Sequence, residues 1–123
     1  MIERSPTGRY ILGPGHILIP CTSIEDWGRA LADDTANIVQ QDVIAPGIAI
    51  STVFLGLDHN MFGDGPPLVF ETMIFREGDG NETFRWSTWD EAMEGHKALT
   101  EALRLLIAQT PTITIGGTLT NDS

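Results

Sequence analysis

Several features common in proteins are scarce in this chain of 123 residues, and each scarcity excludes a class of protein. Cysteine occurs once, as Cys21, so an intrachain disulfide is excluded, and we expect a small buried hydrophobic group there. No run approaches the roughly 20 apolar residues that cross a bilayer, and the N-terminus lacks the apolar core of a signal peptide. We therefore expect no membrane partner and a cytoplasmic location.

Basic residues are also scarce. The chain has 7 Lys and Arg against 17 Asp and Glu, which gives a net charge of −10. Duplex nucleic acid is excluded as a main partner, because its binding depends on many cationic contacts to phosphates. The basic residues are arginines apart from Lys97, and Arg is well suited to planar anions. A small anionic ligand held by one or two arginines is compatible with this composition.

The first half of the chain predicts a hairpin, a short helix and a strand. Two apolar runs, 10–12 and 16–19, flank a Gly-Pro-Gly turn signal. Ser23 is a typical helix N-cap for residues 24–33, in which Trp27 is expected to belong to the core. Residues 36–44 fit either a strand or further helix. The run 48–57 is rich in β-branched residues and predicts a central strand.

The second half predicts a meander and a long helix. Strands are expected at 68–76 and 83–87, joined to their neighbours by Gly-rich connections that suit antiparallel pairs. Thr88 and Glu91 have capping-box spacing, and apolar residues recur at helical spacing from about 89 to 108. Residues 112–115 fit an additional edge strand.

Together these elements predict an α+β fold. It consists of an antiparallel meander sheet of three to five strands, with the long C-terminal helix packed on one face. We expect a single domain over residues 1–123, in which 1–8 and 116–123 are loose.

The first candidate site is the Gly-rich loop 58–67, which leaves the end of the predicted central strand. It gathers Asp58, His59, Asn60 and Asp64, whose oxygen and nitrogen atoms suit ligand contacts or a divalent metal. Glu71 and His96 could join a site for metal-assisted hydrolysis. The structural alternative is an Asp that caps a turn, an exposed His, and glycines that the backbone geometry requires.

The second candidate site is an alternation of arginine and aromatic residues. Arg76, Arg85, Trp86 and Trp89 follow one another along two strands and into the helix, and such a surface can stack a base and pair a phosphate. The alternative is that the aromatic rings fill the core while the arginines lie on a solvated face. His96 lies on the apolar stripe of the helix, where a histidine is usually a core residue with satisfied hydrogen bonds.

Several segments of the chain resemble a family of small proteins encoded in tailed-bacteriophage genomes. They are STVFLGLDHN at 51–60, GDGPPLVFETMIF at 63–75, RWSTWDEA at 85–92 with Gly95-His96, and Trp27-Gly28-Arg29 upstream. The resemblance implies a phage accessory protein in the host cytoplasm. Small phage proteins of this size include sponges that sequester cyclic ADP-ribose isomers or cyclic oligonucleotides, so a role against host defence is expected by analogy.

We therefore expect a non-enzymatic protein, a homo-oligomer, that binds and sequesters a small nucleotide-derived ligand. Its expected ligand-binding residues are Asp58, His59, Asn60, Phe62, Arg76, Arg85, Trp86 and Trp89. No catalytic residue, metal or cofactor is assigned. Two alternatives stay open: a metal-dependent hydrolase of such a nucleotide, and a phage protein that blocks a host protein by direct interaction.

Overall fold

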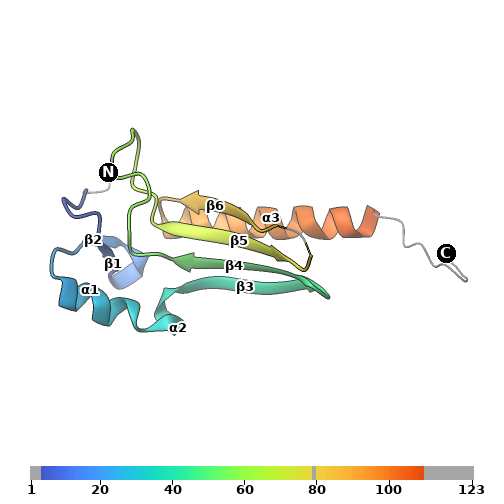
Figure 1. Ribbon diagram of the computed structural model, residues 1–123, viewed down its shortest axis with the longest axis horizontal. Coiled ribbons are helices and arrows are strands. Elements are labelled where there is room, and N and C mark those ends of the chain that lie inside the picture. Colours follow the sequence, from blue (N-terminus) through green and yellow to red (C-terminus); the bar gives the residue numbers. More distant parts are fainter. Residues whose placement is uncertain (1–3, 79, 110–123) are drawn as a thin grey trace, which may run out of the picture.

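The fold contains a four-stranded sheet, a separate hairpin and one long helix, and a computed structural model describes residues 4–78 and 80–109 (Figure 1). The elements in chain order are β1 (Tyr10–Leu12), the 3-10 turn η1 (Pro14–His16), β2 (Leu18–Pro20), α1 (Ile24–Leu31), α2 (Asp34–Asn37), β3 (Ile38–Ala45), β4 (Ile48–Phe54), β5 (Phe70–Arg76), β6 (Glu82–Trp86) and α3 (Trp89–Gln109).

The main sheet is an antiparallel meander in the order β3-β4-β5-β6. Helix α3 packs on one face of this sheet and contacts all four strands (Figure 1). The sequence prediction of an α+β fold with a C-terminal helix on a meander sheet is therefore confirmed. No helix within residues 4–78 and 80–109 is long and apolar enough to cross a membrane.

The alternation of buried and more exposed side chains along β4 and β5 explains why helix α3 packs on one face of the sheet. Ile50, Thr52 and Phe54 are buried on β4, and Phe70, Thr72 and Ile74 are buried on β5. The intervening side chains point to the opposite face of the sheet, because successive residues of a strand alternate between faces. The α3 side carries the core, while the other face carries residues such as Glu71 and Phe75, which are partly exposed.

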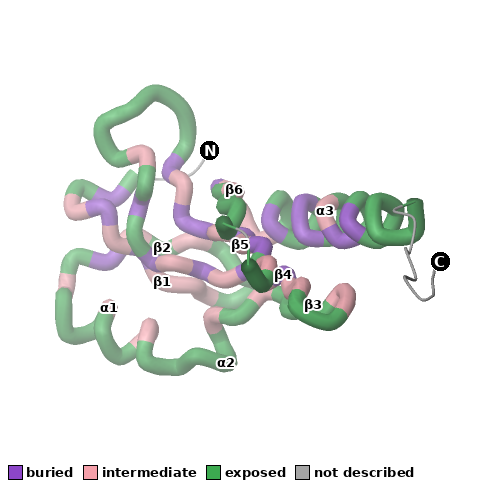
Figure 2. The backbone as a smooth tube through the Cα atoms, turned by 45° about the vertical axis from the view of Figure 1, so that its right-hand side comes forward, coloured by how far each residue is buried: buried purple, intermediate pink, exposed green. Residues whose placement is uncertain are grey.

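Helix α3 begins with the predicted capping box. The Glu91 amide donates to Thr88 Oγ1 over 3.1 Å, and the Ser87 amide donates to Glu91 Oε1 over 3.0 Å. Gly95 lies directly under the Trp86 ring, where an added Cβ would lie 2.3 Å from Cζ2. A glycine is therefore required for the helix to approach β6 this closely. The C-terminal turns of α3 are mostly exposed (Figure 2).

The N-terminal hairpin packs on the end of the sheet through Tyr10, which is fully buried. The Tyr10 amide donates to the Gly56 carbonyl, and its hydroxyl accepts a bond of 2.7 Å from the Ser5 amide. Trp27 of α1 also donates to the Gly56 carbonyl, over 2.9 Å, and is half-buried. Cys21 is a buried free thiol, as the sequence predicts.

Several boundaries differ from the sequence prediction. The central strand ends at Phe54 rather than residue 57, because the chain turns at Gly56, whose φ is 75°. The ambiguous segment 36–44 divides into the end of α2 and most of β3. Residues 4–8, expected to be loose, are held by hydrogen bonds from Arg4 and Ser5. Residues 112–115 and 116–123 lie outside the described residues.

Candidate functional site

The candidate functional site is a groove of about 320 Å³ between α3 and the edge strand β3. We call it the β3–α3 groove. Its lining side chains are Gln40, Asp42, Met93, His96, Lys97, Thr100, Glu101 and Arg104. The helical residues recur three or four positions apart, so they share the face of α3 that looks toward β3.

His96 forms the floor of the groove and joins the helix to the sheet. It is only 3% exposed, and both ring nitrogens have partners. Nε2 lies 2.7 Å from Asp42 Oδ2 on β3, and Nδ1 lies 2.7 Å from Thr52 Oγ1 on β4. The interpretation of His96 as a core histidine with satisfied hydrogen bonds is confirmed.

The hydrogen bonds continue from His96 across the sheet. Thr52 Oγ1 lies 2.6 Å from Thr72 Oγ1, and the Trp86 indole donates to Thr72 Oγ1 over 2.9 Å. An indole can only donate, so the Trp86 N–H donates to Thr72 Oγ1, and an ionised carboxylate can only accept, so the His96 Nε2–H donates to Asp42 Oδ2. Either hydroxyl can be the donor between Thr72 and Thr52, and Nδ1 can accept from or donate to Thr52. Every side-chain polar atom named in this row therefore has a partner.

The Asp42 carboxylate is the end of the row that faces the groove. The hydrogen bond from His96 holds the pKa of Asp42 below its ordinary value, and weaker contributions come from Gln40 and the nearby Arg104 charge. Partial burial acts in the opposite direction, because it disfavours the charged carboxylate. Asp42 is consequently ionised at neutral pH.

Thr52, His96 and Asp42 have the order of a nucleophile, a base and an orienting carboxylate. Thr52 is nevertheless fully buried, and its hydroxyl is shared between His96 and Thr72. A substrate cannot reach this oxygen in the described conformation. The row therefore acts as a structural connection between β3, β4, β5, β6 and α3 rather than as a catalytic triad.

Three side chains on the α3 wall of the groove have no hydrogen-bond or ion-pair partner among the described residues for their hydroxyl or charge. Thr100 is 7% exposed, and its Oγ1 is the one buried side-chain polar atom within the described residues that lacks a hydrogen-bond partner. Lys97 and Arg104 flank it at spacings of three and four residues. Neither cation forms an ion pair with any residue in 4–78 or 80–109. An anion can therefore bind here without displacing an existing carboxylate.

The loop 58–67, the first site predicted from sequence, is organised by internal hydrogen bonds. Asp58 Oδ1 accepts from the amides of Asn60 and Leu68, and Oδ2 pairs with Arg4 over 3.0 Å. The Asn60 side chain donates to the Asp64 carbonyl over 2.6 Å. His59 and Phe62 are exposed. Asp58 caps the loop and His59 is exposed, as in the structural alternative, and the Asn60 side chain also holds the loop, which that alternative did not include.

The second predicted site is divided between different surfaces. Arg85 pairs with Glu71 over 3.2 Å on the face of the sheet away from α3, whereas Trp86 lies on the α3 face against Gly95. Arg76 pairs with Glu82 over 2.6 Å at the far end of the same strands. Trp89 stacks on His16 with ring centroids 3.5 Å apart. Arg85 and Trp86 line one hollow, but Arg76 and Trp89 do not line it, so the four residues are not gathered around one ligand.

A second hollow, of about 690 Å³, includes Arg85 and Trp86 together with Asp90, Glu91 and Glu94. Three carboxylates against one paired arginine make this hollow unfavourable for a phosphate. The first turn of α3 is also engaged by Thr88 and Glu91, so fewer of its amides are free for an anion.

The residues of the hydrolase alternative do not form a metal site in the described structure. Within residues 4–78 and 80–109, no group of three or more His, Cys, Asp or Glu side chains is placed to hold a metal ion. Glu71 lies on the face of the sheet opposite His96, and Asp58 is engaged by Arg4 and two amides.

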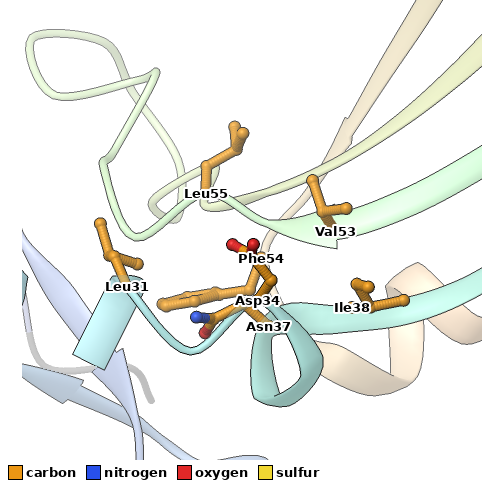
Figure 3. A pocket seen from close by; sticks show the side chains of 7 residues that line it. All are labelled: Leu31, Asp34, Asn37, Ile38, Val53, Phe54 and Leu55. Carbon is orange, nitrogen blue, oxygen red and sulfur yellow. The ribbon is translucent and has the colours of Figure 1, made fainter. Parts of the chain in front are cut away.

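An apolar pocket of about 480 Å³ lies next to α2 (Figure 3). We call it the α2 pocket. Leu31, Ile38, Val53, Phe54 and Leu55 supply its apolar surface, and Asp34 and Asn37 add polar atoms. Its lining comes from α1, α2, β3, and the end of β4, which the sequence does not show to be neighbours.

Sequence reasoning missed the β3–α3 groove, apart from His96. The available signal was the single lysine of the chain, followed at helical spacing by Thr100 and Arg104 on the side of the helix beside His96. Asp42 could not be added, because segment 36–44 was ambiguous between helix and strand.

No known family model matches the chain, and comparison with curated proteins and with solved structures likewise finds no match. The case for a function therefore depends on the geometry of the site.

Proposed function

We propose that this protein binds a small anionic ligand in the β3–α3 groove and does not alter it covalently. The observation that carries the proposal is the buried, unpartnered hydroxyl of Thr100 between two cations, Lys97 and Arg104, that have no ion pair in the described residues. An unsatisfied buried hydroxyl costs about 1–3 kcal/mol, so a ligand that accepts its proton gains that much in addition to the charge interactions.

The two cations have complementary roles in this proposal. The Arg104 guanidinium can hold a phosphate or carboxylate through two parallel N–H bonds, and the Lys97 ammonium adds a point charge. Asp42 on the β3 wall and Glu101 on the α3 wall provide acceptors beside the cations, which suits a ligand that also carries hydroxyl or amino donors. The proposed ligand class is a small phosphate or carboxylate with neighbouring donors.

A nucleotide-derived ligand belongs to this class, but an aromatic platform for its base does not line the groove. Met93 is the apolar side chain available to a base there. The resemblance to tailed-bacteriophage proteins supports a biological role for such a protein: by sequestering a host nucleotide signal, it would counter the host's defence. This phage role is part of the proposal. A compact phosphorylated metabolite fits the groove as well as a nucleotide does.

The test is a titration followed by ¹H–¹⁵N NMR, with inorganic phosphate and then AMP as probes. We expect saturable shifts of the Lys97, Thr100 and Arg104 amides, with an affinity that falls as salt is added, because the contact is charged. Arg104→Gln should weaken binding about tenfold or more. Arg29→Gln is the matched control, since Arg29 is an exposed helical arginine paired with Asp26 outside the groove.

Two results would contradict the proposal. One is an equal loss of affinity in Arg104→Gln and Arg29→Gln, which would indicate a general charge effect. The other is a set of shifts centred on Arg76, Arg85 or the loop 58–67, which would support the site expected from sequence instead.

A further inference from the structure

We propose that residues 112–115, which lie outside the described part of the chain, add a fifth strand to the free edge of β3. The added strand would run antiparallel to β3, with Thr114 opposite Val43. The inference goes beyond the proposed function and does not rest on it, because this pairing requires no ligand in the β3–α3 groove.

Strand β3 offers an edge to which a strand can be added. Within residues 4–78 and 80–109 it pairs with β4 alone, and its register is continuous from Gln40 to Val43. In an antiparallel pair, alternate residues of an edge strand direct their N–H and C=O groups away from the partner. Proteins often protect such edges with Lys or Pro, and β3 contains neither. An added strand would satisfy these outward groups.

Apolar side chains beside this edge are exposed on both faces of the sheet. Asp42 faces His96 of α3, so the next residue, Val43, points to the opposite face, where it is 77% exposed. On the α3 side, Ile107 is 38% exposed. It lies three residues beyond Arg104, on the stripe of α3 that lines the β3–α3 groove. A strand at the edge would cover both apolar side chains.

The direction of α3 brings the chain to this edge from the correct end. Trp89 packs with Phe54 at the end of β4, and Leu103 packs with Ile50 nearer its start. Helix α3 therefore runs antiparallel to β4 and in the same direction as β3. Its last turn, ending at Gln109, extends past the end of the sheet (Figure 1). A chain that turns back from there meets β3 in the antiparallel direction.

The sequence after α3 suits this path. Two residues separate Gln109 from Thr112, and connections of about 2–6 residues between a helix and a strand are common. One of the two is Pro111, which cannot continue a helix. Thr and Ile are β-branched and favour strands. Their alternation places Ile113 and Ile115 on one face of the strand.

The short connection and the alternation together define the register. With Thr114 opposite Val43, Ile113 comes to lie beside Ile44, because strand residues directly opposite each other share a face. Ile44 packs in the core cluster under α3. Ile113 would therefore point to the α3 side and reach the exposed Ile107. The added strand would also form an outer wall of the β3–α3 groove.

Covalent attachment favours this segment over a second copy or a foreign peptide. A segment joined by a short linker has an effective concentration in the millimolar range at its own site. A second copy must overcome the repulsion between two chains that each carry a net charge of −10. Residues 112–115 carry no charge, so they can approach β3 beside the Asp42 carboxylate without such repulsion.

Hydrogen exchange of the β3 amides, measured by NMR on the full chain, tests the pairing. The amides that point away from β4 should be protected, like those that point toward it. Changing both Ile113→Pro and Thr114→Pro should speed exchange of the outward set about tenfold or more, because one of two consecutive amides must face β3. The amides bonded to β4 should keep their rates, which shows that the fold is intact.

Leu119→Pro with Thr120→Pro is the matched control, because it makes the same change outside 112–115. It should leave every β3 rate unchanged. The proposal is overturned if the outward amides of the wild type exchange freely, or if the two double variants behave alike. It is also overturned if protection appears only at high protein concentration, since a second copy would then supply the strand.

A disulfide scan tests the register and the face without proline. In a Cys21→Ser background, Val43→Cys is combined with either Thr114→Cys or Ile113→Cys. Directly opposite residues of antiparallel strands are close enough for a disulfide, so Thr114→Cys should link to position 43 within one chain. Ile113→Cys should link much less, because its side chain points to the other face. Equal linking of the two, or linking mainly between chains, would contradict the proposal.

Discussion

Nε2 of His96 lies 2.7 Å from Oδ2 of Asp42, so the long helix is hydrogen-bonded to the edge strand across 54 positions of sequence. The same ring holds Thr52 of the central strand through its other nitrogen. This connection fixes the position of α3 relative to β3 and thereby shapes the groove in which Lys97, Thr100 and Arg104 lie. Several consequences of this arrangement can be measured.

His96→Ala should destabilise the protein by about 2–4 kcal/mol, because it leaves a cavity and removes the partner of the buried Thr52 hydroxyl. Urea unfolding followed by circular dichroism measures the loss. Glu94→Ala, an exposed position on the same helix, is the control and should change stability by less than about 0.5 kcal/mol. A His96→Ala protein as stable as this control would show that the row of hydrogen bonds contributes little.

Asp42→Asn tests the lowered pKa of Asp42. A carboxyl whose pKa is lower in the folded state adds stability at pH values above its ordinary pKa of 3.8. That stability is lost as the pH falls through the lower, folded value. The wild type should therefore exceed Asp42→Asn in unfolding free energy at pH 6, and the difference should shrink below about pH 4.

The measurement is urea unfolding of both proteins between pH 2.5 and 6. The charged and titratable groups beside Asp42 are His96, Glu101 and Arg104, and they are common to both proteins. A difference that stays constant over this range, or grows as the pH falls, would contradict the assignment.

Thr72→Val should cost about 1–3 kcal/mol, because it leaves the Trp86 indole without its acceptor and the Thr52 hydroxyl without a neighbour. Valine matches threonine in shape, so the loss reports the hydroxyl rather than packing. Thr72→Ser keeps the oxygen and should retain more of the stability than Thr72→Val. The reverse order would show that the methyl group, and not the hydrogen bonds, matters at this position.

Asp58→Ala should destabilise the protein by about 1–3 kcal/mol and loosen the loop 58–67, because it removes the acceptor of the Asn60 and Leu68 amides. Hydrogen exchange measures the effect, and the Asn60 and Leu68 amides should exchange faster, while amides in β5 change less. Asp64→Ala is the control, since its side chain is exposed at the same loop. Equal exchange in both variants would contradict the role given to Asp58.

Local signals in the sequence identify most of the fold. The β-branched run at β4, the apolar alternation of β5 and the capping box of α3 each report an interaction between residues close in sequence. The local sequence signal failed to distinguish helix from strand at segment 36–44, because α2 passes directly into β3 without a Gly or Pro between them. The strand was assigned only by its pairing with β4, for example Asp42 opposite Ile50.

The candidate site was less accessible to sequence reasoning. Clusters of adjacent polar residues, such as the loop 58–67, attract attention because they are contiguous, yet Asp58 and Asn60 stabilise the loop itself. The arginine and aromatic alternation was real, but strand geometry sends Arg85 and Trp86 to opposite faces of the sheet.

By itself, the sequence determined the acidic charge, the α+β class and the position of the long helix, because composition, period and caps are local properties. Only the tertiary structure decided that Asp42, Thr52 and His96 meet, and that Thr100 lies buried between two cations. Those contacts depend on strand register and on how α3 crosses the sheet. Both are set by packing between segments far apart in the chain, and neither has a local signature.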